Sequence, residues 1–164
     1  MMRRSAMGKE FGVLIVDDDH GFAATLKDIL EEEGYRAVVA GDGRTAQSVC
    51  RDGGFALALV DVRLPDISGV ALIEKLAELS PTMEYIIVTG HASLDTATEA
   101  VGQKRIVAYE TKPLDMPRFL ALVRQVVERH AAQEKLWETE QRSAAFMDSA
   151  TGQLPPFRLR LESG

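Results

Sequence analysis

Cysteine, aromatic side chains and long apolar runs are all scarce in this sequence of 164 residues. Its single cysteine, Cys50, excludes a disulfide within the chain and suits a reducing compartment. It lies in the helical-looking stretch TAQSVCRDG, where we expect a buried thiol rather than a reactive one. No run approaches the roughly 18 apolar residues of a membrane span, and the start MMRRSAMGKEFG has no signal-peptide apolar segment. We therefore expect a cytoplasmic protein without membrane contact.

The chain also lacks an excess of positive charge. Nineteen Lys and Arg residues stand against 25 Asp and Glu residues, which gives a net charge of −6. This balance disfavours a bulk electrostatic attraction to nucleic acid or to an anionic membrane. The apolar fraction of 46% is ordinary for a packed domain, and the 6% aromatic fraction predicts a core of Val, Leu, Ile and Ala.

Short apolar runs alternate with amphipathic segments along most of the chain. Runs rich in β-branched residues predict five strands, at 12–16, 36–40, 56–60, 84–88 and 106–109. Helical spacing predicts helices at 22–34, 43–54, 68–80, 93–101 and from Asp115 onward. This alternation predicts an α/β, doubly wound fold, with a five-stranded parallel sheet and helices on both faces. The carboxyl ends of such strands share one edge, where ligands bind.

Three segments lie outside this alternating pattern. We expect residues 1–9 to be disordered and the folded domain to cover 10–130. Good helix formers with scattered apolar residues over 131–150 predict that the last helix continues as an extension or linker. The Pro-interrupted residues 151–164 predict a flexible tail or the stub of a downstream module.

Polar side chains suited to phosphoryl transfer follow four of the predicted strands. They are Asp17, Asp18 and Asp19 after the first strand, Asp61 after the third, Thr89 after the fourth and Lys112 after the fifth. Clustered carboxylates raise one another's pKa unless a cation neutralises them, and their oxygens suit Mg²⁺. A carboxylate can attack phosphorus, while a metal, a hydroxyl and an ammonium stabilise the transferring group. We therefore expect one shared site.

Four pieces of sequence resemble a known family: VLIVDDDH, LALVDVRLPDISGV, YIIVTGHAS and AYETKPLD. Their order and spacing over residues 10–130 resemble the receiver domain of bacterial two-component response regulators. The resemblance implies a flavodoxin-like sheet with strand order 2-1-3-4-5. It also implies that Asp61 accepts a phosphoryl group from the phosphohistidine of a histidine kinase or a phosphotransfer protein. The expected role is signalling rather than enzymatic turnover, although such a domain catalyses its own phosphorylation and dephosphorylation.

The resemblance also implies a ligand set for a metal ion. Asp17 and Asp18 look like the acid pair that holds Mg²⁺, with Asp18 the more direct ligand. Asp61 is the third carboxylate of the set, and the backbone carbonyl of Arg63 completes the protein's share of the coordination. These four residues are the expected metal site.

Two residues look like the partners of the phosphoryl group. By the family pattern, Thr89 and Lys112 each bind a phosphoryl oxygen, and the peptide bond between Lys112 and Pro113 is cis. Thr89 and Tyr109 fall at the switch positions. Phosphorylation is then expected to change partner binding through the face formed by the fourth helix, the fifth strand and the fifth helix.

Three polar residues near these positions have other expected roles. Asp19 is expected to cap the helix that begins near Gly21. Arg63 and His91 lie two residues beyond Asp61 and Thr89, which by the family's logic places them at the rim of the site. There they either tune hydrolysis of the phosphoryl group or are ordinary exposed side chains.

The chain departs from the family pattern before the fifth strand. Receivers usually carry a Gly-Ala pair shortly before the switch aromatic residue. Here the region reads VGQKRIVAYETKP, with the glycine at Gly102 and one extra residue. We expect the loop before the fifth strand, and the helix ahead of it, to differ in shape.

Two other functions fit part of the sequence. A haloacid-dehalogenase-type phosphatase also uses a strand-end Asp, an Asp-x-Asp pattern, a Thr and a Lys. No acidic pair follows Lys112 and no cap domain is present, while DVRLPDISG would have no role in such an enzyme. The other alternative is a non-phosphorylated interaction domain with a receiver fold, against which the complete acid, Thr and Lys set argues.

About 35 residues follow the receiver-like part, which is too few for a DNA-binding domain. We therefore expect no direct nucleic-acid binding by this chain. A homodimer is expected through the C-terminal helix or through the face around the fifth strand, unless the chain is part of a larger protein. A seven-residue spacing favours pairing of the helix, at Val123, His130, Trp137 and Ala144.

Overall fold

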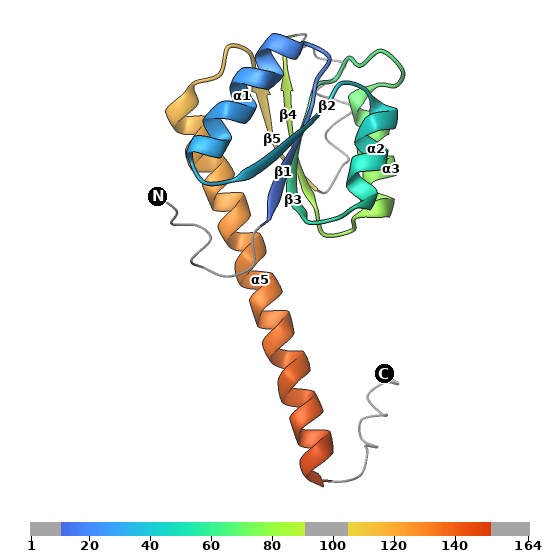
Figure 1. Ribbon diagram of the computed structural model, residues 1–164, viewed down its shortest axis with the longest axis vertical. Coiled ribbons are helices and arrows are strands. Elements are labelled where there is room, and N and C mark those ends of the chain that lie inside the picture. The colour runs from blue at the N-terminus through green and yellow to red at the C-terminus, as the bar shows by residue number, and fades with distance from the viewer. Residues whose placement is uncertain (1–10, 91–104, 152–164) are drawn as a thin grey trace. The chain divides into compact units, whose positions relative to one another are not determined.

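Five parallel strands form one sheet in the order β2-β1-β3-β4-β5 (Figure 1). The computed structural model describes residues 11–90 and 105–151. The strands coincide with the five apolar runs, and their bounds are β1 Gly12–Val16, β2 Arg36–Ala40, β3 Phe55–Val60, β4 Glu84–Thr89 and β5 Ile106–Thr111. The predicted doubly wound sheet and its strand order are confirmed.

The described helices lie where the apolar spacing predicts them. Their bounds are α1 His20–Glu32, α2 Gly43–Arg51, α3 Gly69–Leu79 and α5 Met116–Thr151. Asp19, Asp42 and Ser68 cap the first three, each accepting a hydrogen bond from the amide three residues further on. The predicted capping role of Asp19 is thus confirmed, whereas the predicted helix at 93–101 lies outside the described residues.

Alternating side chains of the strands fill two apolar cores, one on each face of the sheet. In β1, Leu14 and Val16 pack with residues of α2 and α3, whereas Val13 and Ile15 pack with α1 and the first turns of α5. Figure 1 shows these helix pairs on opposite faces. Burial on both faces explains why the strands read as continuous apolar runs. Cys50 belongs to the α2–α3 core and is buried, as predicted.

Strand β5 contains one residue that has no partner in β4. Tyr85 lies opposite Ile106 and Ile86 lies opposite Ala108, so that Val107 is the extra residue. The predicted change of shape in the loop and helix before β5 falls on residues that lie outside the described part of the chain. Beyond Val107 the pairing is regular, and β5 therefore ends beside β4 at the carboxyl edge of the sheet.

The chain divides into two units, Met1–Val127 and Glu128–Gly164. The sheet, α1 to α3 and the first turns of α5 belong to the first unit. The second unit contains the rest of α5. No helix in the described part of the chain is long and apolar enough to cross a membrane.

Candidate functional site

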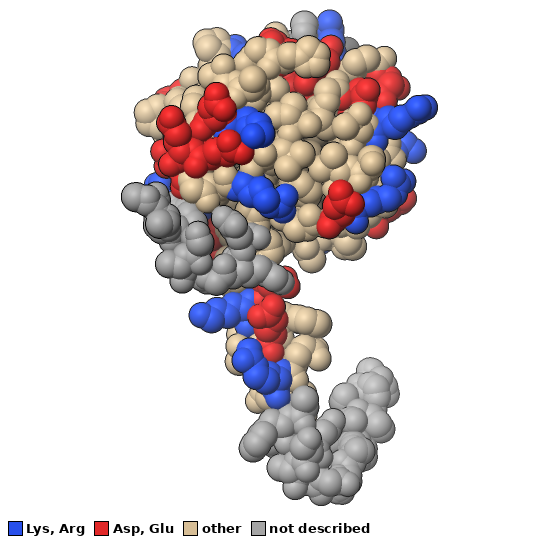
Figure 2. Space-filling model, viewed as in Figure 1, with Lys and Arg blue, Asp and Glu red and all other residues tan. Residues whose placement is uncertain are grey.

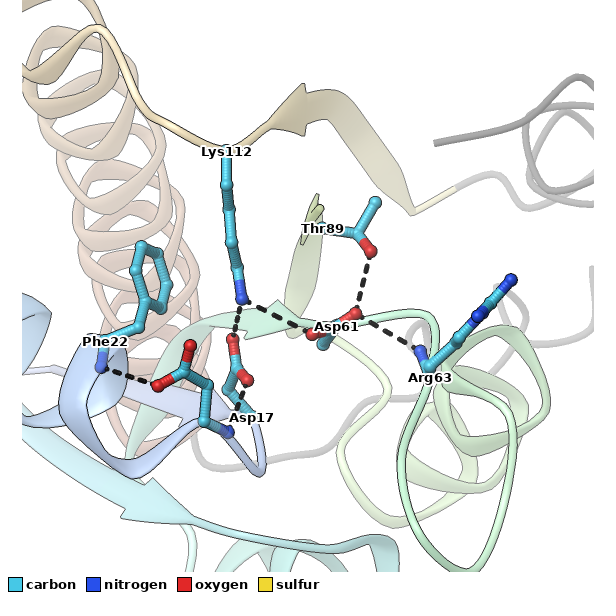
Figure 3. Close-up of polar contacts among 7 residues, drawn as sticks. Asp17, Phe22, Asp61, Arg63, Thr89 and Lys112 are labelled. Atoms are coloured by element: carbon cyan, nitrogen blue, oxygen red, sulfur yellow. Dashed lines mark hydrogen bonds and ion pairs between the residues drawn. The ribbon is translucent and has the colours of Figure 1, made fainter. Parts of the chain in front are cut away.

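Four of the predicted site residues meet at the carboxyl edge of the sheet (Figure 3). Asp17 directly follows β1, Asp61 follows β3, Thr89 is the last residue of β4 and Lys112 follows β5. Asp17 is only 2% exposed, Asp61 5% and Thr89 0%, so their polar groups depend on one another rather than on water. The parallel topology brings them together although 95 residues separate Asp17 from Lys112.

Three groups hold the carboxylate of Asp61. The hydroxyl of Thr89 donates a hydrogen bond of 2.8 Å to Oδ1, and the amide of Arg63 donates one of 3.2 Å to the same oxygen. Oδ2 accepts a hydrogen bond of 3.4 Å from Nζ of Lys112. Each oxygen therefore has a donor, and the carboxylate is fixed at the end of β3.

The ammonium of Lys112 also binds the second buried carboxylate. Its Nζ lies 2.8 Å from Oδ2 of Asp17, whose Oδ1 accepts a hydrogen bond of 2.9 Å from the amide of Asp19. Lys112 therefore bridges Asp17 and Asp61, and it places one positive charge between the ends of the neighbouring strands β1 and β3.

Burial and neighbouring charges both influence the pKa values of Asp17 and Lys112, with a different balance at each group. Burial raises the pKa of Asp17, and the hydrogen bond from Lys112 offsets only part of this effect. Burial alone would lower the pKa of Lys112, but the hydrogen bond and charge of Asp17, helped by Asp61, outweigh it and raise that pKa. Burial is the largest single influence on the pKa of each group, but at Lys112 the hydrogen bonds and charges of the two carboxylates together exceed it.

Three carboxylates gather at the same edge. Asp17, Asp18 and Asp61 each offer an oxygen, and these oxygens lie within 4.8 Å of one another. Asp18 is exposed, whereas the other two are buried. Three carboxylates facing one ammonium leave a negative site, and a set of hard oxygen donors suits a divalent cation. The residues therefore fit a divalent metal ion.

Backbone contacts fix the loop between β3 and α3. The amide of Gly69 donates a hydrogen bond of 2.8 Å to the carbonyl of Val62, and Arg63 pairs with Ser68 in an isolated antiparallel bridge. A Cβ atom on Gly69 would collide with the backbone carbonyl of Asp61. Glycine at this position therefore lets α3 start directly against the residue that carries the central carboxylate.

Two contributors to the site were not predicted from the sequence. The ring centroid of Phe22 lies 4.2 Å from Nζ of Lys112. Asp66 accepts hydrogen bonds from the first two amides of α2, those of Gly43 at 2.9 Å and Arg44 at 3.0 Å, and so ties the β3–α3 loop to that helix. No local sequence pattern predicts either contact, because each contact joins residues of different secondary-structure elements.

The remaining predicted residues lie around this centre or outside the described chain. Tyr109 packs against the α2–α3 core, and its buried hydroxyl has no hydrogen-bond partner in the part of the chain that the structure describes. The peptide bond between Lys112 and Pro113 is cis. Arg63 is exposed, which agrees with a rim position, and His91 lies outside the described residues.

Comparisons with known proteins agree with this arrangement. The family description "Response regulator receiver domain" matches residues 13–124. The transcriptional regulatory protein ZraR of Escherichia coli (strain K12) is 34% identical over 109 residues, which cover 66% of this chain and 24% of ZraR. The chain therefore spans about a quarter of the length of that relative.

Solved structures show the same fold. A CheY-like response regulator receiver domain protein from Methanospirillum hungatei JF-1 is 37% identical, with a TM-score of 0.66, and the match covers 77% of this chain and 98% of that one. A response regulator from Burkholderia pseudomallei, solved with a phosphorylated aspartic acid, calcium ion and citrate, is 30% identical. Its TM-score is 0.65, and the match covers 85% of this chain and 86% of that one.

Replacing Lys112 by Met is expected to destabilise the metal-free protein in a pH-dependent manner. Without the ammonium, the pKa of Asp17 rises further above its ordinary value of 3.8. The loss of unfolding free energy should be on the order of 3 kcal/mol near pH 7, where a buried carboxylate is left unpaired. It should shrink below about pH 3.5, where the carboxyl is protonated in both the folded and unfolded states.

Urea unfolding in the presence of a chelator measures this difference at both pH values. Lys75→Met serves as the matched control, because Lys75 is an exposed lysine on α3. An equal loss at the two pH values, or no loss, would contradict the charge balance assigned to Lys112.

Proposed function

The chain belongs to the response regulator receiver domain family, and from this premise we propose that it is a phosphorelay receiver whose Asp61 accepts a phosphoryl group. The observation that carries the proposal is the set of donors around this carboxylate. Thr89 and Lys112 approach different oxygens of Asp61 at 2.8 and 3.4 Å (Figure 3). A receiver needs this arrangement, since the same donors can bind the oxygens of the arriving group.

In this mechanism Asp61 is the nucleophile. Its carboxylate oxygen attacks the phosphorus of a phosphohistidine, and the bond between phosphorus and the histidine nitrogen breaks. The hydroxyl of Thr89 and the ammonium of Lys112 then each bind an oxygen of the phosphoryl group and offset its negative charge. The phosphorylated aspartic acid of the similar Burkholderia pseudomallei protein supports this assignment.

Mg²⁺ is the proposed metal. Asp17, Asp18 and Asp61 would supply carboxylate oxygens, and Arg63 its backbone carbonyl. A bound Mg²⁺ supplies neutralisation of the negative charge that gathers on the carboxylates and the phosphoryl oxygens. The calcium ion of the Burkholderia pseudomallei structure supports a divalent cation in a protein with this fold.

The proposed output is a change of partner. The phosphoryl group adds charge at a buried edge and competes for the hydroxyl of Thr89, which now binds Asp61. Movement of Thr89, together with Tyr109 on the neighbouring strand β5, would alter the face formed by β5, α5 and the helix expected between β4 and β5. The phosphodonor is a histidine kinase or a phosphotransfer protein, and the chain acts as a signalling domain rather than a turnover enzyme.

Asp61→Asn is expected to abolish phosphorylation. Incubation with acetyl phosphate and Mg²⁺ should label the wild-type protein, as detected by intact-protein mass spectrometry, because the carboxylate forms an acyl phosphate. The variant should remain unlabelled, and a chelator should prevent labelling of the wild type. Asp28→Asn is the matched control, since Asp28 is an exposed acid on α1 and should be labelled as wild type. Labelling of Asp61→Asn would refute the assignment.

A homodimer formed through α5 is part of the proposal. Leu136 and Trp137 are neighbours on this helix and are 60% and 58% exposed, although the surrounding residues are polar. Large exposed apolar side chains on a polar helix favour a partner helix, and a second copy supplies the same surface.

Light scattering should therefore detect a dimer that is lost when Leu136 and Trp137 are both changed to Gln. Trp137 is the sole tryptophan, and its emission should shift to the blue as the wild-type dimer forms. The exposed neighbour Lys135 provides the control variant Lys135→Gln. A wild type that stays monomeric at all concentrations, with and without acetyl phosphate, would exclude this pairing.

A further inference from the structure

One contact of the Lys112 ammonium involves an uncharged side chain. Nζ lies 2.8 Å from Asp17, 3.4 Å from Asp61 and 4.2 Å from the ring centroid of Phe22. An ammonium has three N–H groups, and these three partners can occupy all of them. A cation within about 6 Å of an aromatic centroid is attracted by the negative face of the ring. The ring is therefore a third partner of the lysine.

The fold fixes the position of this ring. Phe22 lies in the first turn of α1, and its amide donates a hydrogen bond of 3.1 Å to the capping carboxylate of Asp19. Its side chain is half-buried and packs against the core between the sheet, α1 and α5. Figure 3 shows the ring beside the Lys112 side chain, on the side opposite Thr89. Helix capping and core packing thus place an aromatic face at the edge of the charged site.

The proposed reaction changes the contacts of the Asp17 and Asp61 carboxylates but not those of the Phe22 ring. In the function proposed above, Asp17 and Asp61 would exchange partners when a cation binds and when a phosphoryl group arrives. Phe22 has no charge and binds neither group, so its attraction to the ammonium persists through both events. Such a fixed contact reduces the reorganisation that Lys112 would otherwise undergo during the transfer.

We propose that Phe22 is a positioning residue for Lys112. Its ring holds the ammonium at the site while Asp17 and Asp61 change partners. The ammonium of Lys112 is therefore already in position when the phosphoryl oxygen arrives. The proposal rests on the function proposed above for Asp61. It assigns to the first turn of α1 a part in phosphoryl transfer that is separate from the acidic residues before it.

A spectroscopic measurement tests the contact without phosphorylation. In protein with isotope-labelled lysine, the ring current of Phe22 should move the Hε protons of Lys112 upfield, and Lys112→Met identifies their signal. The shift should remain after Mg²⁺ is added, persist in Phe22→Tyr and disappear in Phe22→Leu. Absence of the shift in the wild type, or its loss on addition of Mg²⁺, would overturn the proposal.

A double-mutant cycle tests the effect on the reaction. Phe22→Leu should lower the maximal rate of labelling by acetyl phosphate about two- to fivefold, as expected for one cation–π contact. Phe22→Tyr should restore the rate, and Phe22→Leu should have no further effect in the Lys112→Met background. An unchanged rate in Phe22→Leu, or an equal decrease in both backgrounds, would contradict a role through Lys112.

Phe55→Leu is the matched control for loss of an aromatic ring near a cation. The ring of Phe55 lies 4.8 Å from the guanidinium carbon of Arg36, and Phe55 is the first residue of β3, at the end opposite Asp61. Its replacement should leave the labelling rate unchanged. If Asp61→Asn were still labelled, the proposed function would fail, whereas the ring-current shift would still decide whether Phe22 holds Lys112.

Discussion

Two carboxylates buried at the ends of neighbouring strands require a positive charge beside them. Asp17 and Asp61 are 2% and 5% exposed, and the ammonium of Lys112 binds both. An unpaired buried carboxylate would destabilise the fold, whereas the bridged pair is tolerated. With Asp18 the edge still carries three carboxylates for one ammonium, and this imbalance makes it suitable for a divalent cation. The same charge requirement thus governs the stability of the edge and its chemistry.

The fold serves this edge in two ways. The parallel arrangement brings the ends of β1, β3, β4 and β5 together. Hydrogen bonds between loops and helix starts then hold the residues that follow the strands. Asp19 caps α1 and also donates its amide to Asp17, so that the start of the helix and the buried acid are linked. Asp66 ties the β3–α3 loop to α2. Figure 2 shows acidic and basic side chains at several separate places on the visible face of the first unit.

Much of this architecture is predictable from the sequence, because its causes are local. Apolar runs predict the strands, and helical spacing with a capping residue predicts the first three helices. The strand-end motifs identify Asp61, Thr89 and Lys112 because a parallel sheet has one carboxyl edge. Contacts between elements could not be predicted in this way. The ring of Phe22 meets Lys112 because the first turn of α1 and the residue after β5 come together at the carboxyl edge of the sheet, and the position of the unpaired residue Val107 depends on the register between β4 and β5.

The charge balance at this edge implies that a divalent cation completes the site formed by its carboxylates. A titration with Mg²⁺, followed through the backbone amide NMR signals of Asp19 and Arg63, measures whether the cation binds there. These two amides bind Asp17 and Asp61 respectively, and they therefore report on both buried carboxylates. Both signals should shift with the same saturable dependence on Mg²⁺ concentration, whereas the amide of Gly12 at the other end of β1 should not shift. Signals of Asp19 and Arg63 that stay unchanged up to millimolar Mg²⁺ would show that these carboxylates do not bind the cation.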